Sequence, residues 1–377
     1  MGIIHIYSNY PDYKWVGDED EGIACVDDAA RAAVFYLRNY QSKKDTNSLK
    51  KSEGLIEFLL FMQGENGFFY NFLLTDHSIN KTHKNSINRP SWWTWRAMWA
   101  LSEGCIILKE VNPGLTQQIK TALIKSVESV KQNLSKENGT RTMRGVEFPA
   151  WLPEESAADQ SSDLVVALLN YYEETKDVGV IYYLNHLCDG ILLMQKGTKS
   201  EIPYNAFLSW QNIWHAYGNC QSYALLRASK FLQRSELRNA ALNEINFFYN
   251  YSLKSNYLSS FELEKEGDSL KFSMETSFPQ IAYNFRPMIF ACLEASAQTG
   301  DSVYAQKAVE ISGWFFGWNI SCSQMYNFST GICFDGIDAE GDVNMNSGAE
   351  STIEALLSMQ MLEQYGISKN NLLKRFF

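Results

Sequence analysis

The pattern that most constrains the fold is an alternation of two kinds of helical segment along the whole chain. Segments of the first kind are apolar nearly all round and are expected at residues 27–41, 92–109, 159–175, 218–232, 284–299 and 347–361. Segments of the second kind carry one charged face and are expected at 48–62, 115–134, 178–195, 236–251 and 302–318, with a weaker sixth at 368–376. A helix that is apolar all round must be buried, whereas an amphipathic helix can face solvent.

The apolar segments recur at intervals of roughly 65 residues, which is the signature of an internal repeat. Each interval holds one buried helix, one amphipathic helix and a loop. This repeat predicts an all-α fold, an (α/α)6 barrel of six α-hairpins with the buried helices inside. We expect one toroid domain over residues 1–377, with residues 1–25 as a short lead-in. An open superhelix of hairpins is the alternative, but the chain ends show no capping repeats of the kind that a superhelix needs.

The composition excludes several classes of protein. The net charge of −10 gives no overall basic field that would attract nucleic acid. The sequence contains no run of 18 apolar residues, so no membrane span is predicted. Five scattered histidines and seven cysteines without a C-x-x-C pair argue against a metal site. Cys322 and Cys333 flank a turn-rich stretch and are either paired or reduced. We expect a monomer without a cofactor, and residues 1–6 lack the pattern of a signal peptide.

Acidic residues collect where the apolar segments begin. The stretch "CVDDAARAA" places Asp27 and Asp28 at the start of the first segment, and "NSGAEST" places Glu350 at the start of the last. Because the inner helices of a closed ring run the same way, these starts lie at one end, joined by the long loops. The first and last hairpins are then neighbours, so the three acids are expected to approach one another. Two carboxylates that flank one bond are what glycoside hydrolysis needs.

Helix capping is the alternative role for these acids. Asp27 suits an N-cap, acids are favourable in a first helical turn, and Ser347 with Glu350 fits a capping box. The doublet of Asp27 and Asp28 favours chemistry, because one Asp is enough for a cap. In the leading hypothesis Glu350 is the general acid, with a pKa raised by apolar surroundings and neighbouring acids, and Asp28 or Asp27 is the base or nucleophile.

Aromatic and polar side chains at the same end suit a sugar ring. Flat aromatic faces pack against C–H groups while polar neighbours bind hydroxyls, as in most concave ligand sites. The predicted substrate-binding residues are Trp92, Trp95, Arg96, Trp151, Asp159, Trp210, Trp214, His215, Arg286 and Asp335. Trp92 and Trp214 are the expected sugar platforms. Core packing is the alternative for the tryptophans, and pairing with the acids is the alternative for the arginines.

Several stretches resemble a bacterial group of carbohydrate-associated proteins within the six-hairpin glycosidase superfamily. These stretches are "GIACVDDAARAAVFYL", "GFFYNFL", "RPSWWTWRAMWAL" and "CFDGIDAEGDVNMNSGAEST", and the resemblance spans nearly the whole chain. It implies the (α/α)6 barrel, a carbohydrate substrate and a periplasmic or extracellular location. The superfamily includes hydrolases, uronyl hydrolases, lyases and sugar epimerases, so the resemblance implies no single activity. Its site markers here are Asp27, Asp28, Trp92, Trp93, Trp95 and Glu350.

Three functional hypotheses follow. The first is a glycoside hydrolase that acts on an oligosaccharide through two carboxylates. The second is a lyase or epimerase of uronic or amino sugars, which needs a His215 or Tyr217 base and Arg286 as a carboxylate clamp. The third is a glycan-binding protein without turnover, in which the aromatic residues matter and the acids do not. Unsaturated products would select a lyase, and saturable binding without turnover would select the third hypothesis.

Overall fold

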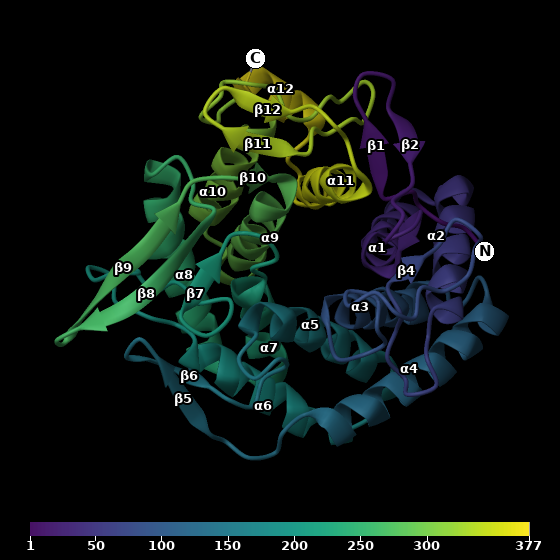
Figure 1. Cartoon of the computed structure of the whole chain (residues 1–377), viewed down its shortest axis with the longest axis horizontal. Coiled ribbons are helices and arrows are strands. Elements are labelled where there is room, and N and C mark those ends of the chain that lie inside the picture. Colours follow the sequence, from purple (N-terminus) through teal and green to yellow (C-terminus); the bar gives the residue numbers. More distant parts are fainter. Residues whose placement is uncertain (377) are drawn as a thin grey trace. The chain divides into compact units, whose positions relative to one another are not determined.

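Every predicted helix is present in the computed structural model, which describes residues 1–376 (Figure 1). The first helices of the predicted pairs are α1 (Val26–Lys43), α3 (Trp92–Ile107), α5 (Ala158–Thr175), α7 (Gln221–Leu232), α9 (Ala282–Thr299) and α11 (Ala349–Gln364). The second helices are α2 (Thr46–Phe61), α4 (Pro113–Asn133), α6 (Gly179–Leu193), α8 (Ser235–Lys254), α10 (Ser302–Ser312) and α12 (Lys369–Phe376). A short 3-10 helix, η1 (Gly313–Phe315), follows α10.

Burial separates the two kinds of helix as the alternation predicts. Helix α3 buries thirteen of its sixteen residues, whereas α4 buries eight of its twenty-one. The boundaries have local causes. Helix α4 begins with Pro113, which fits a first helical position, and the Asn112 side chain accepts from the Leu115 N–H at 3.1 Å. The structure is therefore all-α in its core, in agreement with the predicted class.

Short antiparallel strands occupy the loops that lead into the first helix of each pair. They are β1 (Tyr7–Asn9), β2 (Lys14–Val16), β3 (Ala24–Cys25), β4 (Phe72–Leu73), β5 (Thr140–Met143), β6 (Val146–Pro149), β7 (Ile213–His215), β8 (Ser260–Glu266), β9 (Ser269–Thr276), β10 (Gln280–Ile281), β11 (Gly336–Ala339) and β12 (Asp342–Asn344). They form the small sheets β1-β2, β3-β4, β5-β6, β7-β8-β9 and β10-β11-β12. The segment 1–25, predicted as a lead-in, is thus folded into strands.

The chain divides into two compact units. The first unit comprises Met1–Leu134, Asp163–Leu184 and Asn346–Ile353. In it α1 packs against both α2 and α3, and the β1-β2 hairpin extends away from α1 and α2 (Figure 1). The first unit thus contains the start of α1 and the start of α11.

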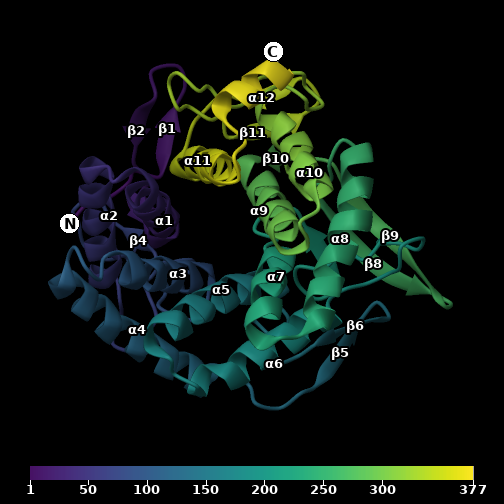
Figure 2. The same cartoon turned by 180° about the vertical axis from the view of Figure 1, so that it is seen from behind.

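The second unit comprises Ser135–Ser162, Asn185–Met345 and the residues from Glu354 onward. In it α7 packs against α8 and α9, and α9 packs against α10. The long β8-β9 hairpin projects beyond α8, as Figure 2 shows. The second unit thus contains the start of α5, which carries Asp159, and the β7 strand with His215.

Two expectations drawn from composition concern the chain as a whole. Within residues 1–376 no helix has the length and apolar character needed to cross a bilayer. All seven cysteines are free thiols, so Cys322, which is exposed, and Cys333, which is buried, are not paired.

Candidate active site

Residues 23–25, the three before helix α1, are hydrogen-bonded to residues 72–73 of the loop after α2, and the helix begins directly after them at Val26. Gly22 has a φ of 94°, and a Cβ there would lie 2.2 Å from the Leu73 carbonyl oxygen, so only glycine lets the two backbones approach. Strand β3 then pairs with β4. The Val26 N–H donates to the Asn71 carbonyl oxygen at 2.8 Å, and the Asp27 N–H donates to Asn71 Oδ1 at 3.1 Å. These contacts fix the first turn of α1.

Neither acid of the doublet caps α1. The N-cap is Cys25, whose Sγ accepts from the Asp28 N–H at 3.4 Å. Asp27 and Asp28 therefore stand inside the first turn, and the alternative in which Asp27 is the N-cap is wrong. Their carboxylates are left to interact with other side chains.

The buried guanidinium of Arg31 joins the start of α1 to the start of α11. Its Nη2 donates to Asp28 Oδ1 at 2.7 Å and to Glu350 Oε2 at 3.1 Å, and its Nη1 also reaches Glu350 Oε2 at 3.1 Å. Its Nε donates to the Asp27 carbonyl oxygen at 3.2 Å. The structure thus brings Asp28 and Glu350 together around one nitrogen. Glu350 was expected in apolar surroundings, but it contacts a cation instead.

A second buried arginine, Arg96 of α3, organises the other side of the doublet. Its Nη1 donates to Asp27 Oδ2, and its Nε lies 3.4 Å from Asp163 Oδ2. Its guanidinium carbon lies 4.7 Å from the centre of the Trp92 ring, within range of a cation–π interaction. The alternative in which an arginine pairs with the acids therefore holds for Arg96. The acid–arginine cluster, as we call it, consists of Asp27, Asp28, Arg31, Arg96, Asp163 and Glu350.

The acids of the cluster differ in their access to solvent. The exposed fraction of the side chain is 4% for Asp28, 21% for Asp27 and 40% for Glu350. Burial raises the pKa of Asp28, and Asp27 adds to the increase, while Arg31 opposes it. Four acids face two arginines, so the cluster carries an excess of negative charge. Asp28 is thus a buried support for Arg31, whereas Asp27 and Glu350 reach the surface.

Backbone hydrogen bonds fix Glu350 from the opposite side. The Ala349 N–H donates to the Ile6 carbonyl oxygen at 2.8 Å, and the Ser347 N–H donates to the Ser8 carbonyl oxygen at 3.0 Å. The Ile6 N–H in turn donates to the Ile23 carbonyl oxygen at 3.2 Å, just before α1. Residues 5–8 therefore connect the segment before α1 to the segment before α11. This connection was missed in the sequence, because residues 3–9 show no clear alternation.

The second unit holds a separate acid–imidazole pair. Asp159, at the start of α5, places Oδ2 2.9 Å from His215 Nε2, and His215 Nδ1 lies 2.9 Å from the Tyr217 carbonyl oxygen. The His215 and Tyr217 rings stack with centroids 3.8 Å apart and an interplanar angle of 11°. Both ring nitrogens lie within hydrogen-bond distance of an oxygen atom. His215 is therefore held in place and has no free nitrogen in this arrangement.

Three tryptophans predicted to bind substrate are core residues. Trp95 packs edge-on against Phe68, and Trp151 donates from Nε1 to the His186 carbonyl oxygen at 3.0 Å. Trp214 is buried and stacks on Phe261 at 5.1 Å. The prediction that Trp214 is a sugar platform is wrong. It sits on β7, where alternation turns it inward and leaves Ile213 and His215 half-buried.

The remaining residues predicted to bind substrate differ in their exposure. Arg286 is buried and bonds to Glu354, with the Tyr283 and Phe290 rings each 5.2 Å from its guanidinium, so it is not a clamp for a substrate carboxylate. Trp210 is exposed, with its Nε1 donating to the Glu154 carbonyl oxygen at 3.1 Å. Asp335 and Trp92 are half-buried.

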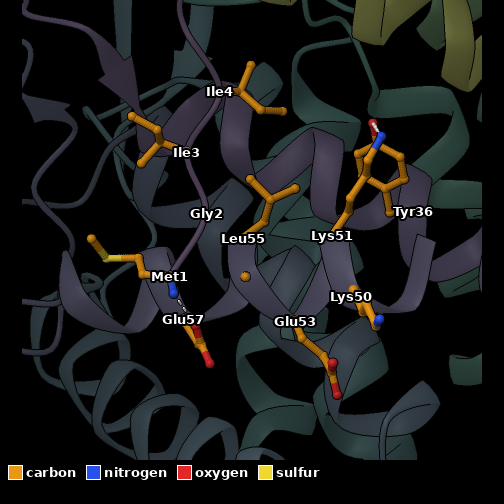
Figure 3. A pocket seen from close by; sticks show the side chains of 11 residues that line it. Met1, Gly2, Ile3, Ile4, Tyr36, Lys50, Lys51, Glu53, Leu55 and Glu57 are labelled. Carbon is orange, nitrogen blue, oxygen red and sulfur yellow. Dashed lines mark hydrogen bonds and ion pairs between the residues drawn. The ribbon is translucent and has the colours of Figure 1, made fainter. Parts of the chain in front are cut away.

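A cavity of about 510 Å³ lies between residues 1–4 and the surfaces of α1 and α2 (Figure 3). Its lining includes Lys51, whose ammonium lies 5.0 Å from the centre of the Tyr36 ring. The acids of the acid–arginine cluster are not among its lining residues, so this cavity is a separate feature of the first unit. Over residues 1–376, no group of three or more His, Cys, Asp or Glu side chains is suited to hold a metal ion.

No family model matches the sequence, and no curated protein matches it. Solved structures do match. A sugar epimerase from a ruminal bacterium is similar with a TM-score of 0.69 at 10% identity, over 96% of this chain and 92% of that one. A cellobiose 2-epimerase from Spirochaeta thermophila gives a TM-score of 0.67 at 11% identity, over 97% and 90%.

A cellulase of C. cellulolyticum, solved with cellobiose, gives a TM-score of 0.54 at 13% identity, over 94% of this chain and 89% of that one. The chain has an (α/α)6-barrel fold. This confirms the predicted fold class and the predicted resemblance in fold to six-hairpin glycosidase-like proteins. Proteins with this barrel include epimerases and hydrolases, so the fold by itself does not select a reaction.

Proposed function

We propose that the protein is a glycoside hydrolase that acts on a neutral oligosaccharide, with Asp27 and Glu350 as its reactive carboxylates. The observation that carries this proposal is that these are the two solvent-reaching acids of one cluster, and each contacts a different buried arginine. In addition, Asp27 Oδ1 is buried and accepts no hydrogen bond from residues 1–376, so it is an acceptor without a partner inside the cluster.

The sequence left Asp28 or Asp27 as the partner of Glu350, and we propose Asp27, with the expected roles exchanged so that Asp27 is the acid and Glu350 the base or nucleophile. The Nη2 atom of Arg31 lies between the carboxylates of Asp28 and Glu350, so a glycosidic bond has no room between them. Asp28 becomes a positioning residue that holds Arg31. Each of the two acids contacts an arginine, so these contacts do not distinguish the acid from the base. We assign the proton for the leaving oxygen to Asp27, whose Oδ1 has no hydrogen-bond partner among residues 1–376, and the role of base or nucleophile to Glu350.

The charges of the cluster favour a neutral substrate. Four acids surround two arginines, and both arginines already contact acids. A uronate would meet excess negative charge here, and Arg286 is occupied by Glu354. A neutral sugar needs hydroxyl partners and an aromatic face instead, and the half-buried Trp92 beside Arg96 supplies the latter.

The test is hydrolysis of a panel of neutral β- and α-linked oligosaccharides by the wild type and by Asp27→Asn and Glu350→Gln. Both variants should lose activity on oligosaccharides at least a hundredfold, in keeping with the usual value of general acid–base catalysis. An aryl glycoside with a good leaving group needs no acid, so Asp27→Asn should retain activity on it while Glu350→Gln should not. Glu340→Gln, a change at an exposed acid outside the cluster, is the matched control.

Two further measurements, chemical rescue and the stereochemistry of the product, complete this test. Azide or formate should restore turnover to Glu350→Ala if Glu350 is a base or nucleophile, because a small anion takes the place of the carboxylate. NMR of the first-formed product gives the stereochemistry, and retention implies a carboxyl separation of about 5 Å, inversion about 6.5–9.5 Å. Full activity in both Asp27→Asn and Glu350→Gln would refute the proposal.

Epimerisation is the second candidate, and two observations favour it. Two of the similar structures are epimerases, and Asp159 pairs with His215 in the second unit. A carboxylate-oriented imidazole suits proton transfer at a carbon next to a carbonyl, once the ring gives up one of its contacts. Incubation with a reducing disaccharide in D2O separates the two candidates. Epimerisation places deuterium at C2 and is abolished in His215→Asn, whereas hydrolysis leaves C2 unlabelled.

A further inference from the structure

The β1-β2 hairpin presents aromatic surface to solvent. Trp15 is 55% exposed and Tyr10 is 51% exposed, and Tyr7 and Val16 are exposed as a cross-strand pair on the face opposite Trp15. A two-stranded hairpin on its own is at best marginally stable in water. Exposed apolar side chains grouped on one small element mark a binding surface more often than chance exposure does.

Trp15 is held as a flat platform. Its indole stacks on the His5 ring with centroids 4.2 Å apart and an interplanar angle of 8°. One face of the indole is therefore covered, and the exposed surface belongs to the other face. A ring that is already fixed loses little conformational entropy when a ligand stacks on it. On the face of the hairpin that carries Trp15, the cross-strand partner is the half-buried Ser8, whose hydroxyl can donate and accept, while the Asn9–Lys14 pair lies on the other face.

The hairpin is hydrogen-bonded to the segment that leads into Glu350. The Tyr10 N–H donates to Asn346 Oδ1 at 3.1 Å. Further along, the Ser347 and Ala349 N–H groups donate to carbonyl oxygens of residues 8 and 6. Three hydrogen bonds thus attach residues 346–349 to residues 6–10. They place the hairpin next to the segment that enters α11.

We propose that the β1-β2 hairpin is a glycan-binding element, on which Trp15 stacks against a sugar ring of a neutral oligosaccharide. This proposal rests on the proposed function, since it places a more distant part of the same substrate. A flat aromatic face with the Ser8 hydroxyl on the same side of the hairpin matches a pyranose ring with its hydroxyls. The hairpin would hold the sugar chain while Asp27 and Glu350 act on another of its bonds.

The test uses isothermal titration of β-1,4-linked gluco- and manno-pentasaccharides into the full chain. Turnover is removed by the Glu350→Gln change where the wild type degrades the sugar. We expect Trp15→Ala to weaken pentasaccharide binding about tenfold, which corresponds to about 1.4 kcal/mol. Trp15→Phe keeps a flat ring and should restore most of the affinity. Tyr182→Ala, a change at an exposed aromatic residue of α6, is the matched control and should bind as the wild type does.

The outcomes separate this proposal from the proposed function. Equal affinity of Trp15→Ala and the wild type overturns the hairpin proposal, while loss of turnover in Glu350→Gln still supports the hydrolase. Weaker binding in Trp15→Ala together with full turnover in Glu350→Gln supports the hairpin proposal and contradicts the proposed hydrolase function. A change of self-association in Trp15→Ala without a change in glycan affinity, measured by sedimentation, would assign the hairpin to a protein interface and overturn the proposal.

Discussion

Replacing Arg31 by methionine tests the role that the structure gives this residue. Methionine fills a similar volume, so the substitution removes the charge without opening a large cavity. Arg31 is buried and bonds to the equally buried Asp28, and removing one partner of a buried ion pair costs about 3–5 kcal/mol. Glu350 also loses its partner, but it is hydrated, so it adds little. We therefore expect Arg31→Met to lower the free energy of unfolding by about 3–5 kcal/mol at pH 8.

The pH dependence of this loss identifies its cause. Burial already raises the pKa of Asp28, and Arg31 opposes that increase, so the pKa of Asp28 rises further in Arg31→Met. A carboxyl group whose pKa is raised by folding loses stability as the pH rises through the folded pKa, and it regains that stability at low pH. The deficit of Arg31→Met should thus be complete at pH 8 and smaller near pH 5. Adding Asp28→Asn removes the unpaired charge and should restore part of the stability.

The assay is urea unfolding followed by tryptophan fluorescence, for the wild type, Arg31→Met and the double variant at pH 5 and pH 8. A deficit below about 1 kcal/mol at pH 8 would place Arg31 among ordinary surface pairs and refute the reasoning. A deficit of equal size at both pH values would show that an unpaired Asp28 is not its cause.

Three further predictions concern single sites. Burial raises the pKa of Glu244 from 4.5 to about 7. The free energy of unfolding of the wild type, relative to that of Glu244→Gln, should therefore fall by about 3 kcal/mol between pH 4.5 and about pH 7. Urea midpoints of the two proteins that differ by the same amount at every pH would contradict this. Trp214→Ala should cost about 3–5 kcal/mol without a separate effect on glycan affinity, and weaker binding at unchanged stability would return Trp214 to the site. Gly22→Ala should lower the thermal midpoint more than Gly267→Ala does. Both glycines have a positive φ, but only a Cβ at residue 22 would clash with backbone, 2.2 Å from the Leu73 carbonyl oxygen. Equal shifts of the thermal midpoint would show that this clash has no effect.

The helices are predictable because the alternation of apolar and amphipathic segments is visible in the sequence. Two errors in their predicted boundaries lie at glycines. The predicted helix at 218–232 begins at Gln221, since Gly218 has a φ of 69° and ends the preceding loop. The predicted helix at 302–318 gives way to η1 at Gly313, where the apolar run of residues 314–316 continues beyond the helix. Hydrophobic periodicity reports burial, and it does not report where the backbone turns.

The sequence predicted Asp27, Asp28, Glu350 and Arg96 of the candidate site, but it did not predict Arg31. The doublet of Asp27 and Asp28 stands out because two adjacent acids exceed what a cap needs. Arg31 lies four residues after Asp27 among buried alanines of α1, and its link to Glu350 joins residues 319 positions apart in the chain. Such a contact depends on tertiary structure, and local patterns do not contain it. The prediction for Trp214 failed for a local reason, because a three-residue strand is too short for its inward and outward alternation to be seen in the sequence.

The central claim is that Asp27 and Glu350 act on one glycosidic bond. A crystal structure of Glu350→Gln with a bound β-1,4-linked pentasaccharide tests it most directly. The account predicts a glycosidic oxygen within about 2.6–3.2 Å of the Asp27 carboxylate, with the adjoining anomeric carbon facing the side chain at position 350. A pentasaccharide bound with its glycosidic bonds beyond reach of both residues, for example against Asp159 and His215, would contradict it.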